Sequence, residues 1–354
     1  MKKTAIVISI IFLFMSCKNN VKENGHAQNS TDEPMPILLD SLISLAKANS
    51  YYAKKVDWSA LRAEMLTVYQ QNDSIDKLGK AAELMFKELG DYHGMLMYDY
   101  KVAFDHRSEE SGPPNDSIYK AIGATKINAP YSVYGELLKE SNVAYIEILG
   151  TGMLQGDQVL MARDEIRTMI CNLKSKKPIG WIIDLRCNIG GNMNPMMAGL
   201  GELISDTNLG GDTKDGLNFN SKWKFENGNF YENGYAHFKA DLKCEELINT
   251  GKIAVLTSIY TASAGEVVAS SLKGQDNVKL IGQKTSGLSS TNGWFVLTEK
   301  WVFAPMTAYY MSKDKTVHYN GIIPDVKIKE ELNLTNLKSG ETVEEAIKWI
   351  TSSK

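Results

Sequence analysis

The segment 252–273 constrains the fold more than any other part of the chain. It opens with the apolar run 253–256, which predicts a buried strand. Small polar residues follow, and apolar residues then recur at helical spacing from Val267 to Leu272. Further strands and helices alternate along the second half of the chain, so we expect an α/β core.

Ser263 lies on the small-residue turn of this segment, directly before the expected helix. A serine in this position exposes its hydroxyl beside the N–H groups of the helix start. Acyl transfer needs this arrangement, an approachable oxygen with amide donors nearby for a developing oxyanion. The alternative is that Ser263 only caps the helix, and the segment alone leaves both interpretations open.

Length and composition limit the class of protein. With 354 residues, 43% hydrophobic and 23% charged, the chain is long enough for a large core and a smaller appendage. The net charge of −3 and the lack of a dense Lys/Arg block argue against a nucleic-acid partner. Four scattered cysteines indicate neither a disulfide framework nor a zinc site, and no motif indicates a metal or another cofactor.

The N-terminus has the pattern of a targeting segment. Lys2 and Lys3 precede the apolar stretch 5–15, which is too short for a stable membrane anchor. The following Ser16-Cys17 resembles the end of a bacterial lipoprotein signal, which implies cleavage after residue 16 and a lipid on Cys17. A plain secretory signal is the alternative. Residues 17–34 then read as a flexible tether, so we expect an exported protein of the cell envelope, held at a membrane.

Helical periodicity dominates the next part of the chain and predicts an N-terminal helical domain over residues 35–103. Asp57 or Ser59 is the expected cap of its second helix, and Gly90 is the expected end of its third. His93 follows on a loop, where a histidine is free to act as a base. Residues 104–130 read as a connector, and residues 131–354 as an α/β core with a C-terminal helix.

A second strand-to-turn motif covers residues 180–192. The apolar run 181–185 predicts a buried strand, and Gly190 and Gly191 form a turn whose backbone can approach a ligand closely. Asp184 is expected to fix this loop. Residues 205–250, rich in glycine, asparagine and aromatic residues, are expected to form hairpin or loop insertions near the mouth of a site.

Six stretches, in this order, resemble one family: V-D-W-S-A-L-R, L-G-D-Y-H-G, D-L-R-C-N-I-G-G-N, T-A-S-A-G-E, V-K-L-I-G-Q-K-T-S-G and N-G-I-I-P-D-V. The chain is similar to the C-terminal processing peptidase and tricorn core protease family of serine peptidases over about residues 40–350. The resemblance implies a ClpP/crotonase-like spiral α/β core behind a small N-terminal helical domain. The first two stretches resemble the tricorn-like branch. Too few residues separate His93 from the strand at Val143 for a PDZ domain, so we expect the cleft itself or the stretch 205–250 to recognise the substrate.

The resemblance also implies site residues. Ser263 corresponds to the nucleophile, and the amides of Ala264 and of Gly190 or Gly191 correspond to the oxyanion hole. One branch of the family places a lysine base where this chain has Leu288, so the Ser–Lys mechanism is closed here.

The tricorn-like branch instead takes its base from the Gly-Asp-x-His motif, which assigns His93. That branch orients its histidine with a glutamate, and the corresponding residue here is His318. His318 or Asp91 is therefore the candidate orienting group. The serine that precedes the histidine in tricorn is Tyr92 here.

The leading hypothesis is a membrane-anchored serine peptidase that cleaves peptides or unfolded protein tails through an acyl-enzyme on Ser263. A protein that keeps this fold but only binds peptides or small apolar ligands, with little or no catalysis, is the alternative. A third interpretation is thioester or isomerase chemistry on a crotonase-like core. The sequence leaves the oligomeric state unknown.

Overall fold

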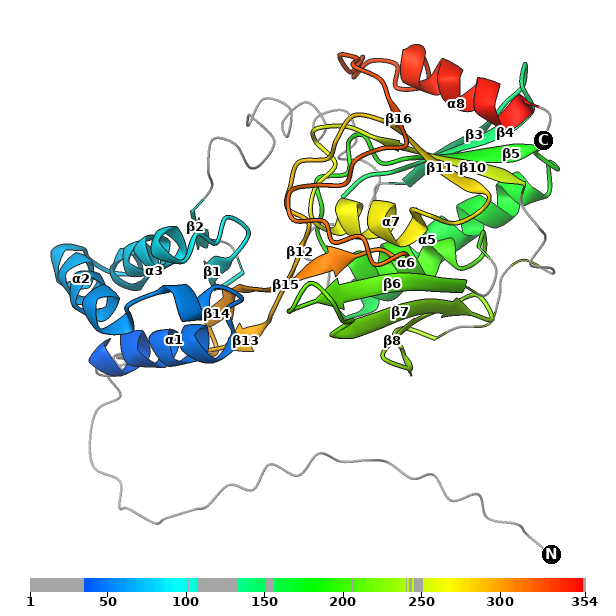
Figure 1. Ribbon diagram of the computed structural model, residues 1–354. Helices are drawn as coiled ribbons and strands as arrows, with labels where there is room; N and C mark the ends of the chain where they lie inside the picture. Colours follow the sequence, from blue (N-terminus) through cyan, green and yellow to red (C-terminus); the bar gives the residue numbers. More distant parts are fainter. Residues whose placement is uncertain are drawn as a thin grey trace, which may run out of the picture.

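The computed structural model describes residues 35–100, 102–106, 133–150, 156–204, 207–239, 241, 244 and 251–352. The expected signal peptide, the tether with Cys17 and nearly all of the connector lie outside these residues. The described chain forms a small N-terminal body and a larger α/β core (Figure 1). None of the helices in these ranges combines the length and the apolar character that crossing a membrane requires.

Three α-helices build the N-terminal body, as the sequence predicts. They are α1 (Met35–Asn49), α2 (Trp58–Gln71) and α3 (Asp76–Leu89), with the short 3-10 helix η1 (Ala53–Lys55) between the first two. Asp57 caps α2, because its carboxylate accepts from the amides of Ser59 and Ala60. Gly90 ends α3 in the left-handed conformation, at φ +70°. Both predicted helix boundaries are thereby confirmed.

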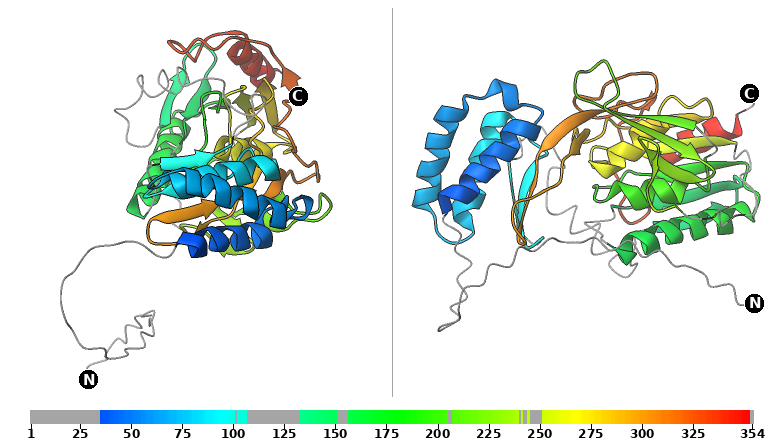
Figure 2. Two further views of the ribbon diagram at one scale, coloured as in Figure 1. Left: turned by 90° about the vertical axis from the view of Figure 1, so that its left-hand side faces the viewer. Right: turned by 90° about the horizontal axis from the view of Figure 1, so that it is seen from below.

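A hairpin from the C-terminal half of the chain completes this body. The strands β1 (Met95–Tyr98) and β2 (Val102–Asp105) form a sheet of order β13-β14-β1-β2 with β13 (Phe295–Val296) and β14 (Trp301–Ala304). Phe303 and Trp301 pack into the same apolar cluster as the helices. The orange strands in Figure 2 cross from the core to these helices. The body is therefore discontinuous in sequence, whereas the expected core, 131–354, included the hairpin.

The core is built on a six-stranded sheet of order β16-β11-β10-β5-β4-β3, in which every pair but β3–β4 is parallel. Its strands are β3 (Val133–Leu138), β4 (Val143–Ile148), β5 (Gly180–Asp184), β10 (Lys252–Thr257), β11 (Val278–Gly282) and β16 (Val326–Lys327). Because parallel strands are buried on both faces, β4, β5 and β10 are apolar almost throughout.

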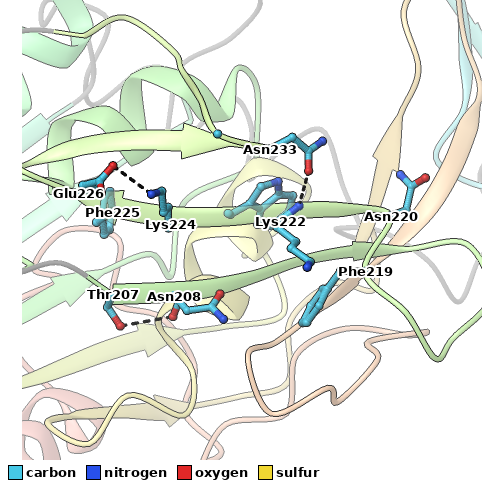
Figure 3. A pocket seen from close by; sticks show the side chains of 11 residues that line it. Thr207, Asn208, Phe219, Asn220, Lys222, Lys224, Phe225, Glu226 and Asn233 are labelled. Atoms are coloured by element: carbon cyan, nitrogen blue, oxygen red, sulfur yellow. Dashed lines mark hydrogen bonds and ion pairs between the residues drawn. The ribbon is translucent and has the colours of Figure 1, made fainter.

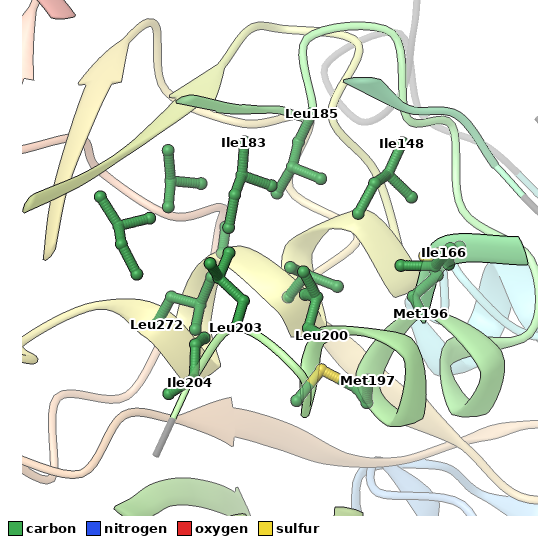
Figure 4. Packing of buried hydrophobic residues seen from close by; sticks show 14 of the residues in the cluster. Ile148, Ile166, Ile183, Leu185, Met196, Met197, Leu200, Leu203, Ile204 and Leu272 are labelled. Carbon is green, nitrogen blue, oxygen red and sulfur yellow. The ribbon is translucent and has the colours of Figure 1, made fainter. Parts of the chain in front are cut away.

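Helices cover both faces of this sheet. Ile183 and Val255 point into the cluster that holds α5 (Asp157–Lys174), α6 (Met193–Leu200) and α7 (Ala264–Leu272), as Figure 4 shows for Ile183. Their chain neighbours Ile182 and Ala254 point to the opposite face, against α8 (Glu341–Thr351). The α/β core with a small helical domain in front of it is therefore confirmed.

The stretch 205–250, expected to form insertions, contributes strands to a second six-stranded sheet, of order β12-β15-β6-β7-β8-β9. Its strands are β6 (Thr207–Thr213), β7 (Ser221–Glu226), β8 (Asn229–Glu232), β9 (Tyr235–Ala236), β12 (Ser290–Asn292) and β15 (Met306–Met311). The hairpin β13–β14 leaves this sheet after β12 and returns to it at β15.

Cys171 and Cys244 form a disulfide across 73 residues of sequence. The sequence analysis did not predict it, because nothing in the spacing of four scattered cysteines shows which pair meets in the fold. The bond attaches the chain near residue 244 to α5.

We predict that Phe303→Ala destabilises the protein strongly. The ring is fully buried and lies against Phe86 with centroids 5.9 Å apart, and its removal leaves a cavity that costs about 3–5 kcal/mol of unfolding free energy. Urea unfolding followed by tryptophan fluorescence measures this loss. The matched control is Val296→Ala on β13, whose side chain is 64% exposed. Equal unfolding free energies for the two variants would contradict the role assigned to the hairpin.

Candidate active site

Ser263 lies at a sharp turn between β10 and α7, as the sequence predicts. Its backbone is in the left-handed region, at φ +50° and ψ −114°, which is costly for any residue other than glycine. The buried carboxylate of Glu266 accepts a hydrogen bond from the Ser263 amide at 3.0 Å. This bond holds the strained turn, so the Ser263 side chain has a fixed direction.

Glu266 also fixes the loop that follows β11. Its second oxygen accepts from the Thr285 hydroxyl and, at 3.1 Å, from the Gly287 amide. Burial raises the pKa of Glu266 to about 7, although these hydrogen bonds oppose the rise. One carboxylate therefore links the serine turn to the loop that leads to β12.

The glycine loop of residues 188–191 packs directly against the serine turn. A Cβ atom on Gly190 would lie 2.8 Å from the Cβ of Ser263, so only glycine permits this approach. The Gly190 amide donates to the Asn188 side chain at 3.0 Å, and the Ala262 amide donates to the Asn188 carbonyl at 2.9 Å. Gly191 and Ala264 line the same cleft as Ser263, whereas the Gly190 amide is held by Asn188.

His93 brings its imidazole from the N-terminal body to this serine. Its Nε2 atom lies 3.0 Å from the Ser263 Oγ atom, and its Nδ1 atom lies 2.7 Å from the Ser290 Oγ atom. With the ring proton on Nδ1, the histidine donates to Ser290 and accepts the Ser263 proton at Nε2. Two of the expected catalytic residues are thus brought together, in the geometry of a nucleophile and its general base.

Ser290 is the site residue that the sequence analysis missed. It lies on β12, three residues beyond Gly287, the last residue of the fifth quoted stretch. Serine also gives no compositional signal within the polar run 289–292. Only the pairing of β12 with β15 brings this hydroxyl to the imidazole.

The backbone around His93 is held at both ends. The buried carboxylate of Asp91 accepts from the amides of His93 (3.1 Å), Gly94 (2.6 Å) and Met306 (2.9 Å). The Asn292 side chain donates to the His93 carbonyl at 2.9 Å. Asp91 therefore positions the loop through its backbone, and β12 and β15 of the core attach this loop of the N-terminal body.

His318 occupies a different place from the expected orienting group. Its Nε2 atom is paired with the Ser312 hydroxyl at 2.6 Å, and its carbonyl accepts from Ser289. Burial lowers the pKa of His318 to about 4, so the ring is neutral at pH 7. The His318 carbonyl accepts from the side-chain hydroxyl of Ser289, one residue from Ser290, while Ser290 itself contacts the His93 ring.

The cleft in front of Ser263 has a volume of about 1140 Å³ and is lined from both bodies. Apolar and aromatic side chains form much of its wall, and these include Met95, Met193, Val267, Leu288, Trp294 and Tyr310. Two carboxylates, Asp105 and Glu232, also line it. A second hollow, of about 780 Å³, lies over β6–β8 (Figure 3) and shares no lining residue with this cleft.

Cys171, Glu202 and Cys244 form the one group of three potential metal ligands within the described residues. The two sulfur atoms are joined to each other in the disulfide. Glu202 is fully buried and is paired with Arg167 at 2.9 Å. The oxidised group therefore offers no thiolate to a metal ion.

The sequence model of Peptidase family S41 matches residues 142–328 of this chain. The nisin-resistance protein of Lactococcus lactis subsp. lactis is 32% identical over 173 residues, which are 49% of this chain and 50% of that protein. The carboxy-terminal processing protease CtpA of Bacillus subtilis (strain 168) is 29% identical over 198 residues, 55% of this chain and 37% of that protein. The matches thus span half or less of these relatives.

A lipoprotein from Streptococcus agalactiae has a similar structure. It superposes with a TM-score of 0.65 at 20% identity, over 91% of this chain and 99% of that chain. At this identity the likeness shows the fold alone. It extends over the N-terminal body as well as the core.

We predict that His318 makes stability depend on pH. The pKa of His318 is about 4 in the folded protein and 6.5 in the unfolded chain. Between these pH values the unfolded chain binds a proton that the folded chain excludes. The stabilisation is complete above pH 6.5 and is lost as the pH falls to 4, by about 3 kcal/mol for a shift of this size. Urea unfolding at pH 7.5 and 4.5 should show a smaller loss for His318→Gln than for wild type. Equal losses would refute the assignment.

We predict that Ser290→Ala slows the reaction of Ser263 with a fluorophosphonate by about 10- to 100-fold, because the imidazole loses a partner that fixes its orientation. Ser290→Thr retains a hydroxyl and is the matched control, expected to react at close to the wild-type rate. Labelling reactions stopped after fixed times, at pH values from 5 to 9, measure the rates of both variants. An unchanged rate in Ser290→Ala would remove Ser290 from the site.

Proposed function

This chain belongs to peptidase family S41, and from that membership we propose that it is a serine peptidase that forms an acyl-enzyme on Ser263. The observation that carries the proposal is the contact of 3.0 Å between the His93 Nε2 atom and the Ser263 Oγ atom. A nucleophile and a base at this distance are ready for proton transfer without rearrangement.

The proposed reaction uses these two residues in both half-reactions. Ser263 Oγ attacks the carbonyl carbon of the scissile peptide, and its proton passes to His93 Nε2. The C–N bond then breaks, and His93 returns the proton to the leaving amine. Water next attacks the ester and gives a proton to His93, which passes it back to Ser263 as the new carboxyl end leaves.

Two backbone amides are the proposed donors to the oxyanion of each tetrahedral intermediate. Ala264 follows the nucleophile at the N-terminus of α7, and Gly191 lies on the glycine loop opposite it. Because the Gly190 amide already donates to Asn188, Gly191 is the better candidate of the two glycines. Fixed donors of this kind stabilise charge as it develops.

His93 and Ser290 together replace a carboxylate-oriented relay in this proposal. Ser290 holds Nδ1, and Asp91 and Asn292 hold the backbone on either side of the imidazole. The Leu288 side chain is 93% buried in the wall of the cleft, at the position where a Ser–Lys enzyme has its base. His93 is therefore the proposed base.

The proposed substrates are peptides or unfolded protein tails, held in the cleft between the two bodies. The relatives, a nisin-resistance protein and a carboxy-terminal processing protease, support this substrate class. We further propose that a lipid on Cys17 anchors the protein in the cell envelope. The Cys171–Cys244 disulfide supports this location, since disulfides persist mainly in oxidising compartments.

A protein that binds peptides without cleaving them is the rival function. It would need neither an imidazole in contact with Ser263 nor a strained backbone at this serine. The pairing of both features at one residue favours catalysis.

We predict that a fluorescent fluorophosphonate labels the full wild-type chain at neutral pH. Ser263→Ala removes the reacting oxygen and should abolish labelling. His93→Ala should lower the labelling rate by about 100-fold or more, since a positioned base contributes about 10²–10⁴. Circular dichroism checks that both variants fold. A folded wild type that resists the reagent would favour the binding protein.

A further inference from the structure

Glu232 lines the same largely apolar cleft as Ser263. Val267 is one helical turn beyond the nucleophile, and both residues line the cleft. Tyr310, also in the wall, contacts the ring of Trp223 at 5.9 Å, and Trp223 pairs across the strands with Glu232. Through Trp223, the Glu232 carboxylate is thus connected to the apolar residue Tyr310 of the cleft wall that also holds Val267 and Ser263.

Hydrogen bonds fix this carboxylate in place. Its Oε1 atom accepts from the Ser221 hydroxyl at 2.7 Å and from the Trp223 indole at 3.3 Å. Its Oε2 atom lies 3.2 Å from the His237 Nε2 atom. The Glu232 side chain remains 27% exposed, so a ligand can reach it.

The described lining of the cleft is poor in positive charge. Among the described residues that line it, none is Lys or Arg. Behind the wall, burial raises the pKa of Asp212, and the negative charge of Glu232 adds to that rise. Glu232 therefore brings a negative charge to a cleft lined largely by apolar side chains.

We propose that Glu232 selects a lysine or arginine side chain of the substrate, at one fixed position near the scissile bond. The long apolar stem of either residue lies along Val267 and Tyr310, and its charged end reaches the Glu232 carboxylate. This inference rests on the proposed function and names its substrate class. Glu232 is thus a specificity-determining residue of the peptidase.

The test uses a peptide library prepared by cleavage after glutamate, in which lysine and arginine stay internal. Mass spectrometry of the products from the full wild-type chain should show Lys and Arg enriched at one position near the cleaved bond, by about tenfold, the ratio that 1.4 kcal/mol produces. Glu232→Gln keeps an acceptor for Ser221 and Trp223 but loses the charge, and should lower the enrichment to the level of the library.

Three further variants sharpen the result. Glu232→Asp keeps the charge and should keep part of the preference, and Glu232→Lys should shift it to Asp, which stays internal in this library. The matched control is Glu226→Gln on β7, which removes a carboxylate that is paired with Lys224 outside the cleft. It should cleave with the wild-type preference. Cleavage without a Lys/Arg preference, or a preference that persists in Glu232→Gln, overturns the inference.

A binding measurement separates this inference from the proposed function. Fluorescence anisotropy with Ser263→Ala compares fluorescein-labelled (Ala-Lys-Ala-Leu)₃ and (Ala-Gln-Ala-Leu)₃. Tighter binding of the lysine peptide that disappears when Glu232→Gln is added supports the inference, even if the wild type cleaves nothing. Equal binding of the two peptides, or no binding of either, overturns it.

Discussion

The crossing of the hairpin β13–β14 into the N-terminal body is the constraint on which the site depends. The hairpin leaves the core after β12 and returns at β15, and it buries Phe303 among helices from the other end of the chain. The segments on either side of this crossing also hold the loop of His93, through Asn292 on β12 and Met306 on β15. The packing that joins the two bodies therefore also places the His93 imidazole beside the Ser263 hydroxyl.

Within the core, Ser263 has a strained backbone, and the hydrogen bonds around it stabilise this conformation. Ser263 at φ +50° is stable because Glu266 holds its amide and Asn188 holds the preceding turn. Asn188 also directs the glycine loop against the serine, where Gly190 permits an approach that a larger residue would block. Since each of these groups is buried and multiply bonded, the site is rigid before any substrate arrives.

Local signals made much of the fold and part of the site predictable. Each of these features depends on residues close together in the sequence: the caps of α2 and α3, the buried strand β10 and the serine turn. Ser290, the hairpin crossing and the Cys171–Cys244 bond escaped prediction, because each depends on segments that meet only in the folded chain. His318 has the sequence position of an orienting residue, but its ring is bonded to Ser312.

The division of the reacting pair between two bodies has a thermodynamic consequence. His93 reaches Ser263 only while the contacts at the junction persist, among them the hydroxyl contact of Tyr52 with Tyr309 and the bond from the Tyr51 amide to Met306. Loss of these contacts would withdraw the His93 imidazole from the Ser263 hydroxyl. In the proposed mechanism, only molecules in which the two bodies are in contact hold the base beside the nucleophile, so local opening at this junction lowers activity without global unfolding.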